Sequence, residues 1–375
     1  MALRIAAWVS PCRASPSEET DMKIKTLAFS MLAAGSLLAG ASALAQEKVD
    51  GLPKTQLQVV GGLSNLTVYQ NFEQPMWTKT IPELSNGQVT ATIKGFNEMG
   101  LKGPEILRLI GQGVIPFGTA TLAYFASDNP INEAIDLAGL APDVKTAREI
   151  TDAFEPVYAK FYGKNNIKVL GFSTYPAQVL FCNANISGLA DIKGKKVRTS
   201  SRTTAEFVQA LGGSSVTLPF GEVVPALQNG VVDCAITGSM SGYSAKWYEV
   251  STHLYALPIN WNQQIHAANL AYWNKLDPKV QDFLQKNIDV MTNKIWDAAA
   301  KETQEGYDCN TGAAACTQPV KGKMKLVEPT DADRALLKKI TAETVVPKWA
   351  ARCSVECVKD FNETIGKKLG ITASK

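Results

Sequence analysis

The side chain of this 375-residue chain that is best placed for chemistry is Arg198, which ends the short run Lys196-Val197-Arg198. That run is typical of a strand, and the Thr- and Ser-rich segment 199–204 can cap a helix whose apolar face comes from residues 207–211. The glycine pair Gly212-Gly213 then ends the helix. A guanidinium at a strand end of an α/β sheet lies where such sheets bind ligands, and its planar fork matches a carboxylate. We therefore expect Arg198 to bind a carboxylate.

Residue patterns typical of catalysis are incomplete. The run Gly238-Ser239-Met240-Ser241-Gly242 has the glycine spacing of a nucleophile elbow, but Met240 stands where the serine is required. The two histidines, His253 and His266, have neither zinc-motif spacing nor a partner that completes a catalytic triad. We expect packing or surface roles for both, and no enzymatic activity, cofactor or metal site. An exported enzyme acting on a carboxylate stays as the weaker alternative.

The elements that must position Arg198 alternate between strand and helix, which predicts an α/β fold with mixed or parallel sheets. The first part of the pattern predicts strands over 57–60, 89–93 and 114–118, and a helix over 104–110. A second sheet is expected between residues 179 and 258, and apolar spacing predicts one long helix over 278–307. A mature chain of about 330 residues exceeds the usual size of a single core, so we expect two domains.

The sequence around Arg198 resembles the solute-binding proteins of tripartite ATP-independent periplasmic (TRAP) transporters, the DctP-like family. The likeness rests on LADIKGKKVRT and ALGGSSVTLPFGEVVPALQNGVVDCA, and extends to IKVLGF before them and AYWNKLDPKVQDFLQ after them. The resemblance implies a two-lobed periplasmic binding protein fold, with hinge strands and a long helix that bridges both domains. It also implies that Arg198 clamps the carboxylate of an organic acid, and that the TRAP membrane subunits are the partners.

The expected domains follow from the two crossovers between the sheets. We expect domain I to comprise residues 46–174 and 264–302, and domain II to comprise residues 175–263 and 303–375. The cleft between two lobes joined by a hinge is the expected ligand site, because closure buries the ligand there. Besides Arg198, we expect the following residues to bind the ligand: Leu63, Ser64, Tyr124, Tyr175, Gln178, Thr237, Trp261 and Asn262.

Two positions separate the chain from the sialic-acid-binding members of the family that it resembles. Gln178 stands where those members have a second arginine, and Thr237 stands where they often have asparagine. A single charge flanked by neutral hydrogen-bonding groups suits a monocarboxylate better than a diacid. Aromatic side chains would supply walls of the pocket, so we expect an aromatic or hydroxylated monocarboxylic acid.

The cysteine pattern predicts disulfide bonds. One of the seven cysteines, Cys12, lies before the expected cleavage site, and the other six are Cys182, Cys234, Cys309, Cys316, Cys353 and Cys357. An even number in an exported protein favours disulfides. Cys182 and Cys234 lie in two expected strands that can be neighbours, so we expect them to pair. Local pairing is expected for the other four, and crossed pairing between the two C-terminal clusters is an open alternative.

The N-terminal region predicts export to the periplasm. A basic start at Met22–Lys25, an apolar stretch over Thr26–Gly40 and the cleavage pattern Ala43-Leu44-Ala45 together form a signal peptide. Residues 1–45 are therefore expected to be an upstream extension plus this signal peptide, and the mature chain to begin near Gln46. An uncleaved anchor would need a longer apolar core, so the mature protein is not expected to span a membrane.

Charge gives little indication of a macromolecular partner. The net charge of +3 makes no case for nucleic acid. Within the class of binding proteins, a ligand sensor that presents its closed form to a receptor stays as an alternative to a transport receptor.

Overall fold

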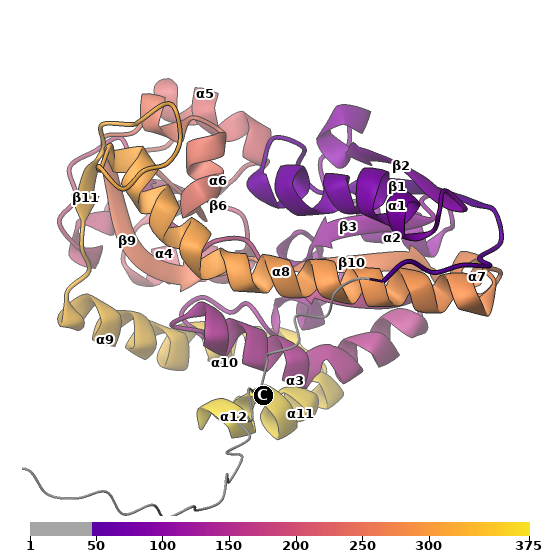
Figure 1. Cartoon of the computed structure of the whole chain (residues 1–375). Coiled ribbons are helices and arrows are strands. Elements are labelled where there is room, and N and C mark those ends of the chain that lie inside the picture. Colours follow the sequence, from indigo (N-terminus) through magenta and orange to yellow (C-terminus); the bar gives the residue numbers. More distant parts are fainter. Residues whose placement is uncertain (1–46) are drawn as a thin grey trace, which may run out of the picture. The chain divides into compact units, whose positions relative to one another are not determined.

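The computed structural model of the chain describes residues 47–375, so the predicted leader lies outside the described residues. Two β-sheets organise this part of the chain (Figure 1). The first sheet has the strand order β2-β1-β3-β10-β4. Its strands are β1 (Thr55–Gly61), β2 (Val89–Gly95), β3 (Phe117–Thr121), β4 (Ile167–Ser173) and β10 (Gln264–Asn269). It is mixed, because β1 is parallel to β2 and β3 whereas β10 is antiparallel to β3 and β4.

The second sheet has the strand order β11-β9-β5-β8-β6-β7. Its strands are β5 (Gln178–Cys182), β6 (Lys196–Thr199), β7 (Ser214–Thr217), β8 (Cys234–Gly238), β9 (His253–Asn260) and β11 (Lys325–Val327). This sheet is also mixed: β6 is parallel to β7 and β8, whereas β5 is antiparallel to β8 and β9. The carboxyl ends of β6, β7 and β8 therefore lie along the same edge, which is where the ligand site is expected.

Helices pack on both sheets. They are α1 (Ile81–Leu84), α2 (Ile106–Gly111), α3 (Val144–Gly163), α4 (Arg202–Ala210), α5 (Val223–Gln228), α6 (Ser239–Ser244), α7 (Leu270–Trp273), α8 (Pro278–Thr311), α9 (Asp331–Ile340), α10 (Val346–Arg352), α11 (Val355–Phe361) and α12 (Lys367–Leu369). None of the helices in the described part combines the length and the apolar character needed to cross a bilayer.

Helix α8 connects the two lobes along its 34 residues (Figure 1). On the side of the first sheet, the Trp296 indole N–H donates to the carbonyl oxygen of Phe172 at 2.9 Å. On the side of the second sheet, Thr303 Oγ1 accepts a bond of 2.9 Å from the backbone N–H of Ala177. Gly306 allows a close approach there, because a Cβ at this position would lie 2.4 Å from the backbone nitrogen of Met240 in α6. The helix is thereby fixed to both lobes.

Two further segments cross between the sheets. The chain leaves the first sheet after β4 through residues 174–177, and returns to it before β10 through residues 261–263. These crossovers lie side by side, because Thr174 Oγ1 donates to the carbonyl oxygen of Trp261 at 3.1 Å. A bundle of two adjacent crossovers and one helix is a hinge region.

Most element predictions hold with local shifts, but the second sheet, predicted between residues 179 and 258, also contains β11 from outside that range. The strand predicted over 114–118 is wrong by three residues, because the C-terminal turn of α2 extends to Val114 and Ile115, whose N–H groups both bond the carbonyl oxygen of Leu109. The helix after Arg198 is capped by Ser201, whose side chain accepts from the N–H of Thr204. The predicted domain boundaries stay a prediction.

Three disulfides are present in the described residues. Cys182 and Cys234 are directly opposite each other on the antiparallel pair β5 and β8, and they are bonded. The C-terminal cysteines form the local pairs Cys309–Cys316 and Cys353–Cys357, not the crossed arrangement. The pairing expected for Cys182 and Cys234 is confirmed, and of the two alternatives left open for the other four cysteines the local one is present.

Candidate functional site

Arg198 is a buried cation that has no anionic partner among residues 47–375. Its side chain on β6 is among the largest fully buried ones, with a residue exposure of 1 %. Nε and Nη2 both donate to the carbonyl oxygen of Leu218, at 3.0 and 2.9 Å, and Nη1 donates to that of Ile236 at 2.9 Å. Within residues 47–375 no carboxylate forms an ion pair with it. Burial lowers the pKa of Arg198 to about 10, so the guanidinium is still charged at neutral pH.

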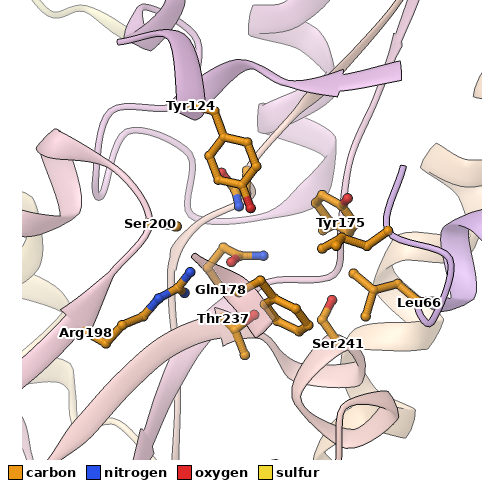
Figure 2. Close-up of a pocket in the computed structure, with 11 residues that line it drawn as sticks. Leu66, Tyr124, Tyr175, Gln178, Arg198, Ser200, Thr237 and Ser241 are labelled. Atoms are coloured by element: carbon orange, nitrogen blue, oxygen red, sulfur yellow. The ribbon is translucent and has the colours of Figure 1, made fainter. Parts of the chain in front are cut away.

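The carbonyl contacts leave part of the guanidinium fork free. Of its five N–H groups, the three bonds above occupy one on each nitrogen, so one N–H remains on each terminal nitrogen. The Trp247 ring lies behind the fork, with its centroid 6.0 Å from Cζ, and Phe220 stacks on that ring. Figure 2 shows the guanidinium directed toward Gln178 and the hydroxyl end of Tyr124. A rigidly held guanidinium with an unused N–H on each terminal nitrogen can donate to both oxygens of a carboxylate.

A small cavity lies against this fork. Its volume is about 20 Å³, and it is lined by Leu63, Leu66, Tyr124, Tyr175, Gln178, Arg198, Ser200, Phe220, Thr237, Ser241 and Asn262. A wider groove of about 420 Å³ shares Leu63, Tyr124 and Phe220 with the cavity. Lys102 and Glu222, both exposed, line this groove and form an ion pair of 3.4 Å. The cavity itself holds about one water, so an organic acid can enter only if the walls separate.

Tyr124 reaches the cavity from the turn η4 (Leu122–Phe125) that follows β3. Its ring packs on Gly103, which has φ +110°, and a Cβ on Gly103 would lie 2.5 Å from a ring carbon. Burial raises the pKa of the Tyr124 phenol, and the nearby charge of Arg198 opposes that rise. The phenol is therefore a neutral hydrogen-bonding group beside the guanidinium.

A buried polar network supports the other wall of the cavity. The Tyr175 hydroxyl accepts a bond of 2.9 Å from Gln264 Nε2, and burial raises its pKa. On the neighbouring strands, His266 bonds Ser173 Oγ at 2.7 Å and Thr119 Oγ1 at 3.0 Å. Burial lowers the pKa of His266 to about 4, so this histidine is neutral at physiological pH and is held as a packing residue.

The structure brings together seven of the nine residues predicted to bind the ligand, and their role in binding stays a prediction. Ser64 and Trp261 do not line the cavity. The Trp261 indole N–H donates to the carbonyl oxygen of Ala141 at 3.0 Å, which holds the ring in the core. Ser64 is engaged by Asn97, which bonds both its backbone N–H and its hydroxyl. Neither Ser64 nor Trp261 is therefore assigned a role in ligand binding.

Four lining residues were not predicted as ligand residues: Leu66, Ser200, Phe220 and Ser241. Three of them share one signal that the sequence does contain. Ser200 follows β6, Phe220 follows β7 by a few residues, and Ser241 follows β8, so all three come after the carboxyl ends of neighbouring parallel strands. The edge of the second sheet thus supplies the fork of Arg198 and the small polar groups around it.

The site combines groups that could bind a small anion. It offers one buried cation, hydroxyls and amides, and aromatic rings, in a cavity between strands of both sheets. Within residues 47–375, no cluster of His, Cys, Asp and Glu side chains could hold a metal ion. Comparison with known proteins agrees with a solute receptor: the profile of bacterial extracellular solute-binding protein family 7, DctP, matches residues 63–349. The chain therefore belongs to this family, the TRAP-type DctP-like solute-binding proteins.

Relatives share the fold at low identity. The chain is similar to the ectoine-binding periplasmic protein TeaA of Halomonas elongata, with 25% identity over 209 residues that span 54% of this chain and 61% of TeaA. It is 23% identical to the 2,3-diketo-L-gulonate-binding periplasmic protein YiaO of Escherichia coli, over 76% of this chain and 85% of YiaO. Among solved structures, DctP7 of Bordetella pertussis, an extracytoplasmic solute receptor binding pyroglutamic acid, has a TM-score of 0.74 at 20% identity, covering 83% of this chain and 99% of DctP7.

Proposed function

We propose that this protein is a periplasmic receptor that captures an organic monocarboxylate and delivers it to the membrane subunits of a TRAP transporter. The carboxylate binds the two free N–H groups of Arg198, and the acid is enclosed as the lobes close. The protein releases its ligand unchanged and is not an enzyme. The narrower ligand class is an aromatic or hydroxylated monocarboxylic acid.

The buried and unpaired guanidinium of Arg198 is the observation that carries this proposal. A buried charge is costly unless it is paired, and here three carbonyl contacts supply dipoles but no opposite charge. A ligand carboxylate supplies that charge. Because Arg198 is the one charged residue among those that line the cavity, the site balances a single negative charge. A second carboxylate would be buried without a partner.

The known relatives support an acid as the ligand. DctP7 binds pyroglutamic acid, and another solved structure of 22% identity, a TRAP periplasmic solute-binding protein from Desulfovibrio salexigens, has bound orotic acid. Both ligands carry one carboxyl group on a ring. The aromatic residues Tyr124, Tyr175 and Phe220 of this chain suit a flat or cyclic acid.

The size of the cavity supports a closing motion. A volume of about 20 Å³ is too small for a ring acid, whereas the groove beyond it has room for one. The hinge of two adjacent crossovers and α8 allows the second sheet to move away from Tyr124 and Leu63. We infer that the cavity opens for the ligand and then closes on it.

The experiment begins with a thermal-shift screen of residues 46–375 against organic monocarboxylates, dicarboxylates and neutral sugars. A ligand that binds only the folded protein raises its melting temperature. For the strongest acid, calorimetry should show that Arg198→Ala costs on the order of 2–5 kcal/mol of binding, and that Arg198→Lys loses the two-pronged contact and binds weakly.

Arg202→Ala is the matched control, because Arg202 is an exposed arginine at the start of α4. It should bind the acid like the unmodified protein. Arg198→Ala binding as tightly as the control, or a response to neutral sugars alone, would contradict the proposal. Chromatographic recovery of the unchanged acid tests the claim that no reaction occurs.

A further inference from the structure

Asn262 lines the cavity, and its buried side-chain oxygen accepts no hydrogen bond from any group within residues 47–375. It lies on the crossover between β9 and β10. The residue is 7 % exposed, and the unpaired oxygen is Oδ1. Buried polar atoms in folded proteins nearly always have a partner, so an orphaned one at a binding cavity calls for a partner from outside the chain.

The position of Asn262 is fixed by Asp136, which follows the turn η5 (Pro130–Glu133). The Asp136 carboxylate accepts from the backbone N–H groups of Trp261 at 2.9 Å and of Asn262 at 3.0 Å, and from Asn260 Nδ2 at 2.7 Å. These bonds hold three consecutive residues of the crossover. They also hold Asn262 in the left-handed region, at φ +56°, which among residues other than glycine asparagine adopts most readily.

Asn262 is therefore a preorganised residue that can determine ligand specificity. The three donors to the buried carboxylate of Asp136 fix the backbone of the crossover, and with it the direction of the Cα–Cβ bond of Asn262. A left-handed conformation with an unpaired acceptor is unfavourable in the empty protein, and a ligand that donates to Oδ1 removes part of that cost. A ligand without a donor leaves the acceptor buried and unpaired.

We propose that the acid bound by this protein carries an N–H or O–H group that donates to Asn262 Oδ1, while its carboxylate binds Arg198. This inference rests on the proposed function and narrows the substrate class to monocarboxylates with such a donor, namely lactam, hydroxy or phenol acids. Asp136 is a positioning residue that holds Asn262 in place. Sites built to bond a polar group discriminate strongly against analogues that lack it.

The test compares acids with near-isosteres that lack the donor. The pairs are pyroglutamate with 3-oxocyclopentanecarboxylate, lactate with 2-fluoropropanoate, and 4-hydroxybenzoate with 4-fluorobenzoate, each titrated by calorimetry into the unmodified protein. In at least one pair we expect the donor acid to bind ten-fold or more tightly than its isostere. If every isostere binds within two-fold of the corresponding donor acid, in each pair that binds, the inference is overturned. Binding that depends on Arg198 would still support the proposed function.

A variant tests whether Asn262 is the residue that produces the preference for acids with a donor group. Asn262→Gly removes the acceptor and keeps a backbone that adopts positive φ freely. It should reduce the preference for the donor acid to about two-fold or less, without abolishing the weak binding of the isostere. A preference that survives in Asn262→Gly would overturn the role of Asn262.

Loss of all binding in Arg198→Ala, with the preference unchanged in Asn262→Gly, would support the proposed function and reject this inference. If none of the six acids binds the unmodified protein, the ligand class itself is contradicted.

Discussion

Glu73 Oε2 accepts a hydrogen bond of 2.9 Å from the backbone N–H of Gly62, the residue immediately before Leu63 in the wall of the cavity. Glu73 is fully buried, and Thr119 is the side chain that interacts with its carboxylate. Burial raises the pKa of this carboxyl to about 7, and the bond from Gly62 opposes the rise. A side chain that holds the first strand-to-helix loop therefore changes charge near neutral pH.

The pH dependence of stability should reflect Glu73. Because the pKa in the folded state lies above the ordinary value of 4.5, the folded protein binds more protons between pH 4.5 and 7. The stabilising contribution is therefore present below pH 4.5 and is lost as pH rises through 7, on the order of 3 kcal/mol. Glu73→Gln should flatten this loss in urea unfolding measured from pH 5 to 8.5. Glu222→Gln, at an exposed acid, should not, and equal slopes in both variants would refute the role of Glu73.

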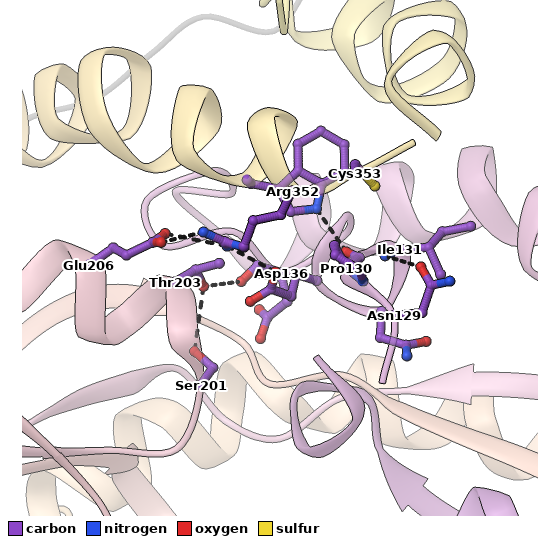
Figure 3. A network of polar contacts seen from close by, with 12 residues as sticks. Asn129, Pro130, Ile131, Asp136, Ser201, Thr203, Glu206, Arg352 and Cys353 are labelled. Carbon is purple, nitrogen blue, oxygen red and sulfur yellow. Dashed lines mark hydrogen bonds and ion pairs between the residues drawn. The ribbon is translucent and has the colours of Figure 1, made fainter. Parts of the chain in front are cut away.

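Arg352 joins two buried carboxylates from separate parts of the chain (Figure 3). It bonds Glu133 Oε2 at 3.0 Å and forms a short contact with Glu206 of α4. Burial raises the pKa of Glu133, and the charge of Arg352 opposes that rise. Arg352→Met would remove the cation that bonds both buried acids, which should lower the unfolding free energy by roughly 3 kcal/mol at pH 8.

The deficit of Arg352→Met should be smaller at pH 5, because protonation removes the uncompensated charge. Chemical denaturation at both pH values measures this difference. Adding Glu133→Gln should restore part of the stability at pH 8. Lys160→Met, which breaks an exposed pair with Glu356, should change stability by less than about 1 kcal/mol. A deficit independent of pH would show that Arg352 acts through packing and not through charge.

Gly103 should control how Tyr124 meets the ligand. Gly103→Ala places a methyl group 2.5 Å from the Tyr124 ring and must displace it, so the acid found by the screen should bind at least five-fold more weakly. Gly87→Ala is the matched control, since Gly87 also has positive φ, at +76°, but no atom lies within 4 Å of a Cβ there. Both variants should lose about 1 kcal/mol of stability from backbone strain. Equal affinities in the two variants would show that the position of Tyr124 does not matter.

The disulfides should differ in their contribution to stability. Cys182 and Cys234 are separated by 52 residues, whereas Cys353 and Cys357 are separated by 4. Because a cross-link restricts the unfolded chain more when its loop is longer, removing the first should cost about 4 kcal/mol and removing the second about 2. Paired Cys→Ala variants, unfolded by urea, measure both losses. The reverse ranking would mean that strain or residual structure dominates over loop entropy.

Local patterns in the sequence predicted the central part of the site. Arg198 stands between a strand and a capped helix, and both signals lie within a dozen neighbouring residues. The long helix was predicted because its apolar spacing is continuous over many turns. Cys182 and Cys234 were predicted to pair because each lies in an apolar strand, and the register of β5 and β8 places them opposite each other.

The remaining parts of the site depend on contacts between distant segments. Asp136 bonds the crossover residue Asn262 across 126 positions of sequence, and nothing near either residue indicates the other. Trp261 was predicted to reach the ligand because it lies on a crossover, but the direction of its ring is set by Ala141, which is equally remote. The raised pKa of Glu73 results from its burial, which no pattern in the neighbouring sequence indicates. Such relationships appear only when the sheets are assembled.

The place of β10 in the first sheet affects how this protein is made. β10 is inserted between β3 and β4, although the whole segment from β5 to β9 separates it from them along the chain. Until residue 269 has emerged during synthesis or translocation, β3 and β4 each lack a neighbour and expose a strand edge. The first sheet can therefore be completed only after the second-sheet strands β5 to β9 have been made, and a chain cut short before β10 would leave the edges of β3 and β4 open to pairing with other chains.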